Sequence, residues 1–276
     1  MERIRQAVEQ AKRERQKIGG ESGPRRIPPG TGAVFVIPEQ PSDSFEYEQT
    51  RCIEVSAEVR NNNRLVAAIK DHPFRDIYKM LRTRVIQEMK ANSWNTVAIT
   101  SPATGAGKTL TAINLSIAIA GDLSHTALLI DGDLRRPSVH KYFDFQPEYG
   151  LSDHLLGDVP LSKVLFHPDM DRLAVLPGKD PIDESAEMLA SPKIVSMLTE
   201  IRSRYSDRIV VVDVAPVLSV DDVLALAPNI DCVLMVAEAG ETSRDDLAQA
   251  LELLDGVPII GTVLNKVDKK IAAFSY

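Results

Sequence analysis

The stretch Thr96-Val-Ala-Ile-Thr-Ser-Pro-Ala-Thr-Gly-Ala-Gly-Lys-Thr-Leu-Thr-Ala-Ile-Asn-Leu-Ser-Ile-Ala118 sets a short, largely β-branched run before a glycine-containing loop and an apolar helix. This order predicts a strand, a phosphate-binding loop and a helix. Gly105 and Gly107 allow backbone N–H groups to close around phosphate oxygens, and the positive end of the helix dipole faces them. The strict P-loop pattern requires glycine where this chain has Pro102, but the strand–loop–helix context is retained.

The loop therefore predicts a nucleotide site, with an ordinary strand–turn–helix as the alternative. Lys108 would reach the β- and γ-phosphates, and the Thr109 hydroxyl would bind Mg²⁺. The residues expected to contact the nucleotide belong to the loop and the first helical turn: Thr104, Gly105, Ala106, Gly107, Lys108, Thr109 and Leu110.

Composition bounds the class of protein. With 276 residues and 44% hydrophobic content, the chain can form one domain and a tail. A net charge of −7 argues against a general nucleic-acid binder. Cys52 and Cys232 have no metal-ligand spacing and suggest no disulfide framework. Because the sequence shows no signal peptide and no apolar run near the ~20 residues of a membrane-spanning helix, we expect a soluble cytoplasmic protein.

The chain divides into three predicted segments. Residues 1–64 form a flexible N-terminal extension, in which 1–18 are a basic helix, either solvated or docked on a surface, and 19–64 a Gly- and Pro-rich linker with little fixed structure. Residues 65–268 form the nucleotide-binding domain, and 269–276 form a short C-terminal tail.

The sequence of this domain predicts alternating strands and helices. Predicted strands are 96–101, 126–131, 172–176, 208–213, 231–237 and 258–264. Predicted helices are 107–120, 150–156, 184–204 with an interruption at Pro192, 220–227 and 242–255. This alternation predicts an α/β fold with a doubly wound, mostly parallel sheet. Ligands bind beyond the carboxyl ends of such strands, where the chain has Ser101, Asp131, Asp213 and Asn265.

Acidic residues at two strand ends suit Mg²⁺–phosphate chemistry, although a surface loop is the alternative for the first pair. Asp131 and Asp133 flank one glycine and precede Arg135. One acid can hold metal-bound water or accept a hydroxyl proton, while the arginine offsets phosphate charge. Asp213 ends a hydrophobic strand, as a Walker B acid does. We therefore expect Lys108, Asp131, Asp133 and Arg135 to act in catalysis, and Thr109, Asp131 and Asp213 to bind the metal.

These motifs resemble the Walker A, A′ and B motifs of the bacterial tyrosine kinases, which belong to the MinD/ParA-like P-loop ATPases. The matching segments are 101–109, 128–137 and 209–213, and the resemblance spans roughly residues 70–268. More narrowly, the chain resembles the stand-alone autokinases of exopolysaccharide loci, including the exosortase-associated group. The Min and Par branch has a signature lysine where this chain has Ala103, which favours the kinase branch.

The resemblance implies ATP and Mg²⁺ as cofactors and tyrosine autophosphorylation that regulates polysaccharide chain length or export. It also implies a membrane-embedded polysaccharide co-polymerase as partner, which would hold the protein at the inner membrane, a tyrosine phosphatase, and no nucleic acid. The family's assembly helix carries Glu-x-x-Arg-x-x-Arg, and this chain has Asp76, Lys79 and Arg82 at those positions. Residues three apart share a helix face, so assembly into homo-oligomers is expected, with a solvated charged face as the alternative.

The sequence gives the least information about the tyrosine that accepts phosphate and the residue that contacts the nucleotide base. The family's tail carries several tyrosines, whereas this tail carries Tyr276 alone, which is the predicted acceptor, with Tyr47 as its rival. If autophosphorylation is lost, the alternatives are a non-kinase ATPase switch that controls a membrane assembly and a regulatory partner with degenerate catalysis.

The segment 265–268 matches the guanine-reading Asn-Lys-x-Asp of GTPases, but Asp-x-x-Gly does not follow the strand that ends at Asp213. Because Asn265 stands at a strand end near the expected base site, we expect it to contact the adenine edge.

Overall fold

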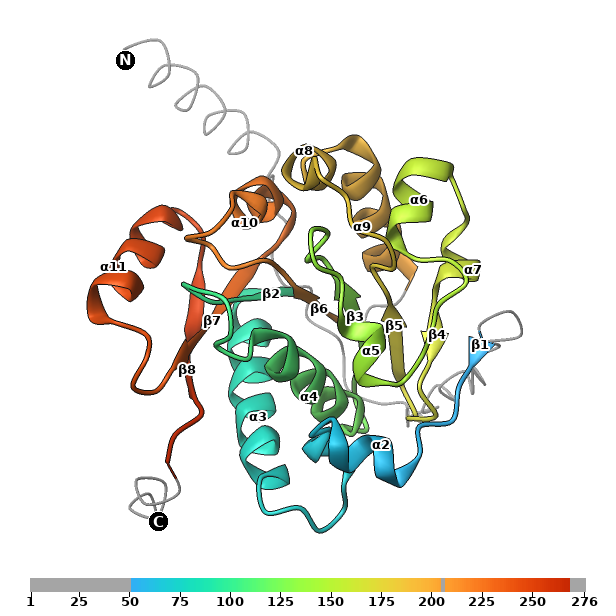
Figure 1. Ribbon diagram of the computed structural model, residues 1–276, viewed down its shortest axis with the longest axis horizontal. Helices are drawn as coiled ribbons and strands as arrows, with labels where there is room; N and C mark the ends of the chain where they lie inside the picture. Colours follow the sequence, from blue (N-terminus) through green and yellow to red (C-terminus); the bar gives the residue numbers. More distant parts are fainter. Residues whose placement is uncertain (1–50, 205–206, 269–276) are drawn as a thin grey trace, which may run out of the picture. The chain divides into compact units, whose positions relative to one another are not determined.

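Within residues 51–204 and 207–268, which the computed structural model describes, eight strands form one sheet in the order β1-β4-β5-β3-β6-β2-β7-β8 (Figure 1). The strands from β5 to β8 in this order are mutually parallel, β4 is antiparallel to β5, and β1 is parallel to β4. The strand bounds are β1 Arg51–Cys52, β2 Thr96–Thr100, β3 Thr126–Asp131, β4 Phe166–His167, β5 Leu173–Leu176, β6 Arg208–Asp213, β7 Cys232–Glu238 and β8 Ile259–Asn265.

Helices connect the parallel strands and cover both faces of the sheet. In Figure 1, α3 and α4 lie below the row of strands, and α8, α9 and α10 lie above it. The helix bounds are α2 Ala57–Asn62, α3 Arg75–Asn92, α4 Lys108–Ala120, α5 Val139–Tyr142, α6 Leu151–Gly157, α7 Leu161–Val164, α8 Ser185–Leu189, α9 Pro192–Arg204, α10 Asp222–Leu226 and α11 Arg244–Leu253, with 3-10 turns η1 Val66–Ala68 and η2 Ala227–Asn229. The predicted doubly wound, mostly parallel fold is confirmed.

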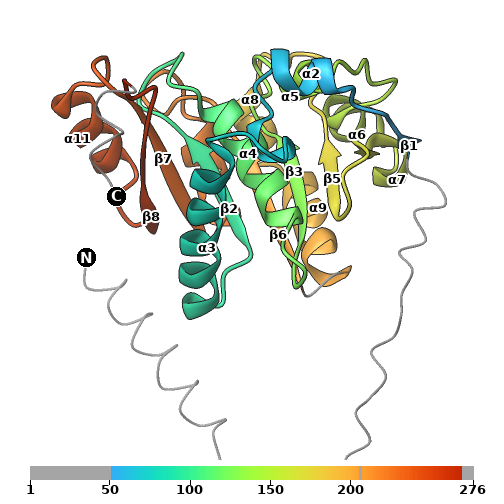
Figure 2. The ribbon, with the colours of Figure 1, turned by 90° about the horizontal axis from the view of Figure 1, so that it is seen from below.

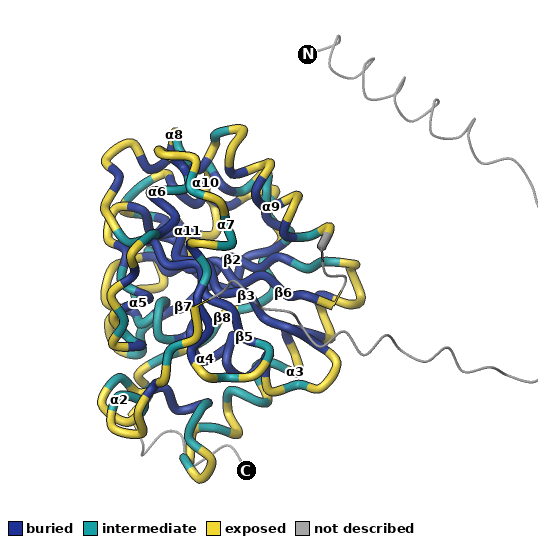
Figure 3. Tube along the Cα trace, turned by 90° about the vertical axis from the view of Figure 1, so that its right-hand side faces the viewer, coloured by how far each residue is buried: buried dark blue, intermediate teal, exposed yellow. Residues whose placement is uncertain are grey.

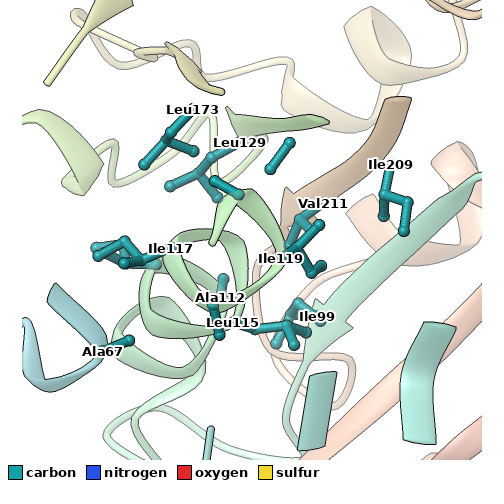
Figure 4. Packing of buried hydrophobic residues seen from close by; sticks show 14 of the residues in the cluster. Ala67, Ile99, Ala112, Leu115, Ile117, Ile119, Leu129, Leu173, Ile209 and Val211 are labelled. Carbon is teal, nitrogen blue, oxygen red and sulfur yellow. The ribbon is translucent and has the colours of Figure 1, made fainter. Parts of the chain in front are cut away.

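Successive side chains along the buried strands point to opposite faces of the sheet and form two hydrophobic cores. Val97 and Ile99 of β2 point into the core on the α3 and α4 side, whereas Ala98 between them points into the core under α9 and α11. Figure 4 shows Leu115 and Ile119 of α4 close to the sheet residues Ile99 and Val211. Figure 3 shows these central strands as the most buried part of the described chain. Each fully buried aliphatic side chain contributes about 1.5–3 kcal/mol, so the two cores stabilise the central strands of the sheet.

The interruption predicted at Pro192 separates two helices. α8 ends at Leu189, and Pro192 is the first residue of α9. Proline suits the first turn of a helix because the N–H it lacks has no intrahelical partner there. None of the helices in the described ranges combines the length and the apolar character that crossing a bilayer requires.

The folded part of the chain begins earlier than the sequence predicted. The linker was expected to run to residue 64, but β1 pairs with β4 and α2 follows it. The Ser56 side chain accepts a hydrogen bond from the Val59 N–H, and Arg60 forms an ion pair of 2.9 Å with Asp169. Backbone pairing and polar contacts with residues far away in the chain stabilise the segment 51–64. Its polar composition therefore gave no sign that it is ordered. The predicted helix over 1–18, most of the linker and the tail over 269–276 lie outside the described residues.

Candidate functional site

The residues predicted at the strand ends gather at one edge of the sheet. β3 and β6 run in register, so that Asp131 pairs with Asp213, and Ile99 of β2 pairs with Asp213 from the other side. The loops beyond these strands enclose a cleft of about 1040 Å³. Its lining includes the predicted residues Thr104, Gly105, Gly107, Lys108, Thr109, Asp133 and Arg135.

The glycines of the loop are required by its backbone. Gly105 has a φ of 88° and Gly107 a φ of 89°, both in the left-handed region that side chains disfavour. A Cβ atom on Gly107 would also collide with the Asn265 side-chain amide. Asn265 donates a hydrogen bond of 2.9 Å from Nδ2 to the Ala106 carbonyl, so β8 holds the loop directly. The α4 helix then begins at Lys108, with its N-terminal N–H groups at the cleft.

Lys108 lies between carboxylates from two other loops. Its side chain is nearly buried, and Nζ lies 2.9 Å from Asp133 Oδ2 and 3.3 Å from Asp213 Oδ1. Burial opposes the charge on Lys108, but Asp213 and Asp133 outweigh this effect and raise the pKa of the ammonium. The Thr109 hydroxyl also accepts a hydrogen bond of 3.4 Å from Lys108 Nζ. The structure therefore brings together four of the predicted site residues.

Asp131 occupies a fully buried position beside this cluster. Its Oδ2 accepts hydrogen bonds from the backbone N–H groups of Ser138 at 2.8 Å and Val139 at 2.9 Å, at the start of α5. Burial and the nearby Asp213 raise the pKa of Asp131 to about 7. Burial likewise raises the pKa of Asp213. The carboxyl pair is therefore costly to ionise fully without a compensating cation.

The donor set fits a Mg²⁺ ion shared with phosphate oxygens. Asp131 Oδ1 and Asp213 Oδ2 are buried and have no hydrogen-bond partner among the described residues. The Thr109 hydroxyl at the head of α4 supplies a further hard oxygen. No group of three or more His, Cys, Asp or Glu side chains suited to a metal occurs in the described ranges. In proteins, Mg²⁺ usually keeps several water or phosphate ligands beside one or two protein carboxylates.

Sequence reasoning missed an acid that contacts Arg135. Asp222, at the start of α10, is fully buried and accepts a 2.6 Å hydrogen bond from the Ser185 hydroxyl. The Arg135 Nε atom lies 3.6 Å from the same Asp222 oxygen. The only sequence signal was the pair of acids, Asp221 and Asp222, that follows the Walker B strand. That signal is indistinguishable from a solvated helix start.

The three residues predicted for assembly do not form one surface stripe. Asp76 and Lys79 form an exposed ion pair of 2.7 Å on α3. Arg82 is half-buried and donates from Nη1 to the Ala118 carbonyl of α4 at 3.3 Å. Apolar residues are exposed on the same helix instead, with Ile77 49% and Met80 50% exposed. The two tyrosines predicted as acceptors, Tyr276 and Tyr47, lie outside the described residues.

Comparisons with known proteins agree with this geometry. A family model described as "AAA domain" matches residues 94–266. The putative tyrosine-protein kinase EpsB of Ralstonia nicotianae is 28% identical over 264 residues, which cover 94% of this chain and 34% of EpsB. The tyrosine-protein kinase etk of Escherichia coli K12 is 30% identical over 201 residues, or 72% of this chain and 27% of etk. The chain thus spans between about a quarter and a third of the length of these curated relatives.

Solved structures of kinase domains also resemble this chain. The kinase domain of the Escherichia coli tyrosine kinase ETK has a TM-score of 0.69 and 26% identity, over 80% of this chain and 90% of that domain. The kinase domain of VpsO has a TM-score of 0.62 and 28% identity, over 73% of this chain and all of that domain. MinD of Pyrococcus horikoshii, at 22% identity and a TM-score of 0.50, shares the fold. The chain therefore belongs to the AAA domain family and shares its fold with the kinase domains of bacterial tyrosine kinases.

Proposed function

We propose that this protein is an ATP-dependent protein-tyrosine autokinase that regulates exopolysaccharide synthesis or export. The observation that carries the proposal is the position of Lys108, whose Nζ lies 2.9 Å from Asp133 and 3.3 Å from Asp213 within the cleft. A cation and two acids at the end of a glycine loop are the groups that phosphoryl transfer requires. The kinase names of the relatives that match this part of the chain support the same chemistry.

Each residue has a proposed task in the transfer. The loop N–H groups and Lys108 bind the β- and γ-phosphates. Thr109 and the buried acids Asp213 and Asp131 would hold Mg²⁺, which offsets the charge of the phosphates. Asp133 accepts the proton of the attacking phenol, and Arg135 stabilises the charge that develops on the transferring group. Asn265 would keep the loop in place and contact the adenine edge.

We propose Tyr276 as an acceptor that enters the site of a neighbouring copy. Eight residues, 269–276, follow Asp268. They can extend about 26–29 Å, which is enough to leave the edge of the sheet. Assembly of neighbouring copies would use the α3 surface, where Lys79 and Asp76 accompany the exposed Ile77 and Met80.

The partners are proposed from the relatives. One is named "Succinoglycan biosynthesis transport protein ExoP" from Rhizobium meliloti, and it is 28% identical over 212 residues, or 26% of its length. By analogy we propose a membrane-embedded polysaccharide co-polymerase as the partner of this chain. The protein would then work at the cytoplasmic side of the inner membrane through that partner, and a tyrosine phosphatase would reverse the modification.

Mass spectrometry of the full chain after incubation with ATP and Mg²⁺ tests the proposal. Phosphotyrosine is expected in the wild type and absent from an Asp133→Asn variant that still binds ATP. Release of inorganic phosphate with no phosphotyrosine in the wild type would overturn the kinase assignment and favour an ATPase switch. Neither product would indicate a regulatory partner with degenerate catalysis.

A further inference from the structure

Arg135, in the loop after β3, depends on another part of the chain for its position. Its side chain lines the cleft and is 41% exposed. Its Nε atom lies 3.6 Å from Oδ1 of Asp222, which belongs to the first turn of α10. Within residues 51–204 and 207–268, Asp222 is the only residue whose side chain forms an ion pair or a hydrogen bond with the Arg135 side chain. Asp222 is therefore the polar group that restrains this guanidinium.

Asp222 is itself held in place by the packed part of the fold. Its side chain is fully buried, and its Oδ1 atom accepts a hydrogen bond of 2.6 Å from the hydroxyl of Ser185. Ser185 is also fully buried and begins α8, which packs against α10 (Figure 1) and lies at the same end of the sheet as α5 (Figure 2). The Ile182 N–H, just before α8, donates to the Leu134 carbonyl at 2.8 Å, so this region also contacts the loop that carries Arg135.

Arg135 provides the charge that balances the buried Asp222 carboxylate. The second oxygen, Oδ2, is buried and has no hydrogen-bond partner among the described residues, where Arg135 is also the only cation that forms an ion pair with the carboxylate. Burial raises the pKa of Asp222, whereas Ser185 and Arg135 lower it. Because a buried carboxylate without a cation is strongly unfavourable, the ion pair favours the conformations of Arg135 that keep Nε beside Asp222.

The contact through Nε leaves the terminal nitrogens of Arg135 available. A guanidinium carries its N–H donors in one plane, on Nε and on both Nη atoms. In the described part of the chain, no acceptor pairs with Nη1 or Nη2 of Arg135. Two such groups can bind two oxygens of one phosphoryl group. The exposed neighbour Arg136 also lines the cleft, but no carboxylate of the described ranges forms an ion pair with it, so the structure restrains Arg135 rather than Arg136.

We propose that Asp222 is a positioning residue for phosphoryl transfer, which holds Arg135 through Nε so that both Nη groups can bind the transferring phosphoryl group. This inference rests on the proposed kinase function, in which Arg135 stabilises the charge on that group. In the transfer, the acceptor oxygen forms a bond to the γ-phosphorus of ATP while the bond from that phosphorus to the β,γ-bridging oxygen breaks. ADP leaves with the bridging oxygen, and the acceptor proton passes to the Asp133 carboxylate.

Asp222 should act on the chemical step rather than on the binding of ATP. The charge that Arg135 stabilises grows as the transition state forms, so a displaced arginine raises the barrier. Lys108, which is proposed to bind the phosphates, pairs with Asp133 and Asp213 rather than with Asp222. Loss of the Asp222 charge should therefore lower kcat and leave KM for ATP unchanged.

Steady-state kinetics of the full chain test this role. Asp222→Asn keeps the size of the side chain and an oxygen that can accept the Ser185 hydrogen bond, but it removes the charge that holds Arg135. It is expected to lower kcat about 10–100-fold, the range found for groups that orient a metal ligand. Asp221→Asn is the matched control, because Asp221 is exposed and its side chain makes no capping hydrogen bond to α10. Wild-type kcat in Asp222→Asn, or a loss confined to KM for ATP, would overturn the proposal.

A double-mutant cycle separates positioning from a structural effect. Arg135→Ala should itself lower kcat about 10²–10³-fold, the range for one lost donor to a transition state. In that chain, adding Asp222→Asn should lower kcat less than about twofold further, because the group to be positioned is already missing. Equal losses from Asp222→Asn in the two backgrounds, or wild-type kcat in Arg135→Ala, would overturn the proposal.

Two products are measured, so that failure of this inference and failure of the kinase function are distinguishable. Phosphotyrosine reports transfer to tyrosine, inorganic phosphate reports transfer to water, and Arg135 would act on the γ-phosphoryl group in both. If the wild type releases phosphate without phosphotyrosine, the kinase function fails and the cycle is measured on phosphate release. If the wild type forms phosphotyrosine and Asp222→Asn matches it, this inference fails and the kinase function stands. If neither product forms, both fail.

Discussion

The Nζ atom of Lys108 lies 2.9 Å from Oδ2 of Asp133, an ion pair that joins the loop after β2 to the loop after β3. Asp213 at the end of β6 completes the contact at 3.3 Å. Three neighbouring strands thus meet at one ammonium group. The same group that is proposed to bind phosphate therefore also contributes to the stability of the fold, since it compensates buried carboxylates.

Replacing Lys108 should affect both ATP binding and stability. Lys108→Met keeps the aliphatic stem but removes the charge, so ATP binding should be lost in a calorimetric titration. The protein should remain folded with a lower melting temperature, because Asp213 and Asp133 lose their partner. Lys90→Met, an exposed change near the end of α3, is the matched control and should leave both quantities unchanged. Undiminished ATP affinity in Lys108→Met would contradict the P-loop assignment.

Neutralising the paired acids should separate binding from turnover. Asp133→Asn and Asp131→Asn should each bind ATP but lose turnover by about 10²–10⁴-fold, the range for general acid–base groups. Asp144→Asn is a suitable control because Asp144 is exposed and has a left-handed φ of 52° that asparagine tolerates. Turnover is measured as phosphotyrosine formed per minute. Wild-type turnover in both site variants would show that Asp131 and Asp133 have only a structural role.

Apolar contact, rather than charge alone, should govern self-association through α3. Ile77→Asp with Met80→Asp should shift the sedimentation profile toward the monomer, since both residues are about half exposed. Gln87→Asp, on the same helix, should not do so. Arg82→Ala should instead lower the melting temperature, because its guanidinium donates to Ala118 of α4. A profile identical to wild type for the Ile77 and Met80 variant would reject assembly through this surface.

Stability should depend on pH through His140. Burial, assisted by Lys141 and opposed by Asp180, lowers the pKa of His140, and its Nδ1 has no partner among the described residues. The folded pKa is therefore below the unfolded value of about 6.5. Below pH 6.5 the unfolded state therefore binds more protons than the folded state. The contribution of neutral His140 to the free energy of unfolding is complete above that pH and is lost below it.

His140→Gln isolates the effect. Chemical denaturation at pH 7.5 and pH 5.5 should show a larger loss of unfolding free energy for the wild type than for the variant. Equal losses in the two proteins would show that His140 does not titrate as its burial requires.

Tyr276→Phe should remove the phosphotyrosine that forms between copies while ATP binding is retained. The phosphate formed on Tyr276 in the wild type should increase with protein concentration, because transfer to a neighbour is bimolecular. Peptide mapping of both proteins over a dilution series measures this. Phosphorylation of Tyr276 at a rate that is independent of concentration would contradict transfer between copies.

Much of the fold and of the site could be predicted because the signals are local. The six longer strands follow from apolar runs that alternate with helical periods, and Pro192 marks the break between α8 and α9. The acids Asp131 and Asp213 stand at strand ends, so a parallel sheet brings them to one edge whatever the details of the packing. The segment 51–64 was missed because β1 and β4 are two residues long and carry no detectable period.

By itself, the sequence determined the strand–loop–helix at residues 96–118, the parallel sheet and which candidate site residues stand at the strand ends, because glycine, proline and apolar periodicity act within a few residues. Only the tertiary structure decided that Asp222 contacts Arg135, that Arg82 turns onto α4, and that Arg51 pairs with Phe166 of β4. Those contacts join residues far apart in the chain. Their geometry depends on strand order and on which side chains the packed core leaves room for, and neither is encoded in any short window of sequence.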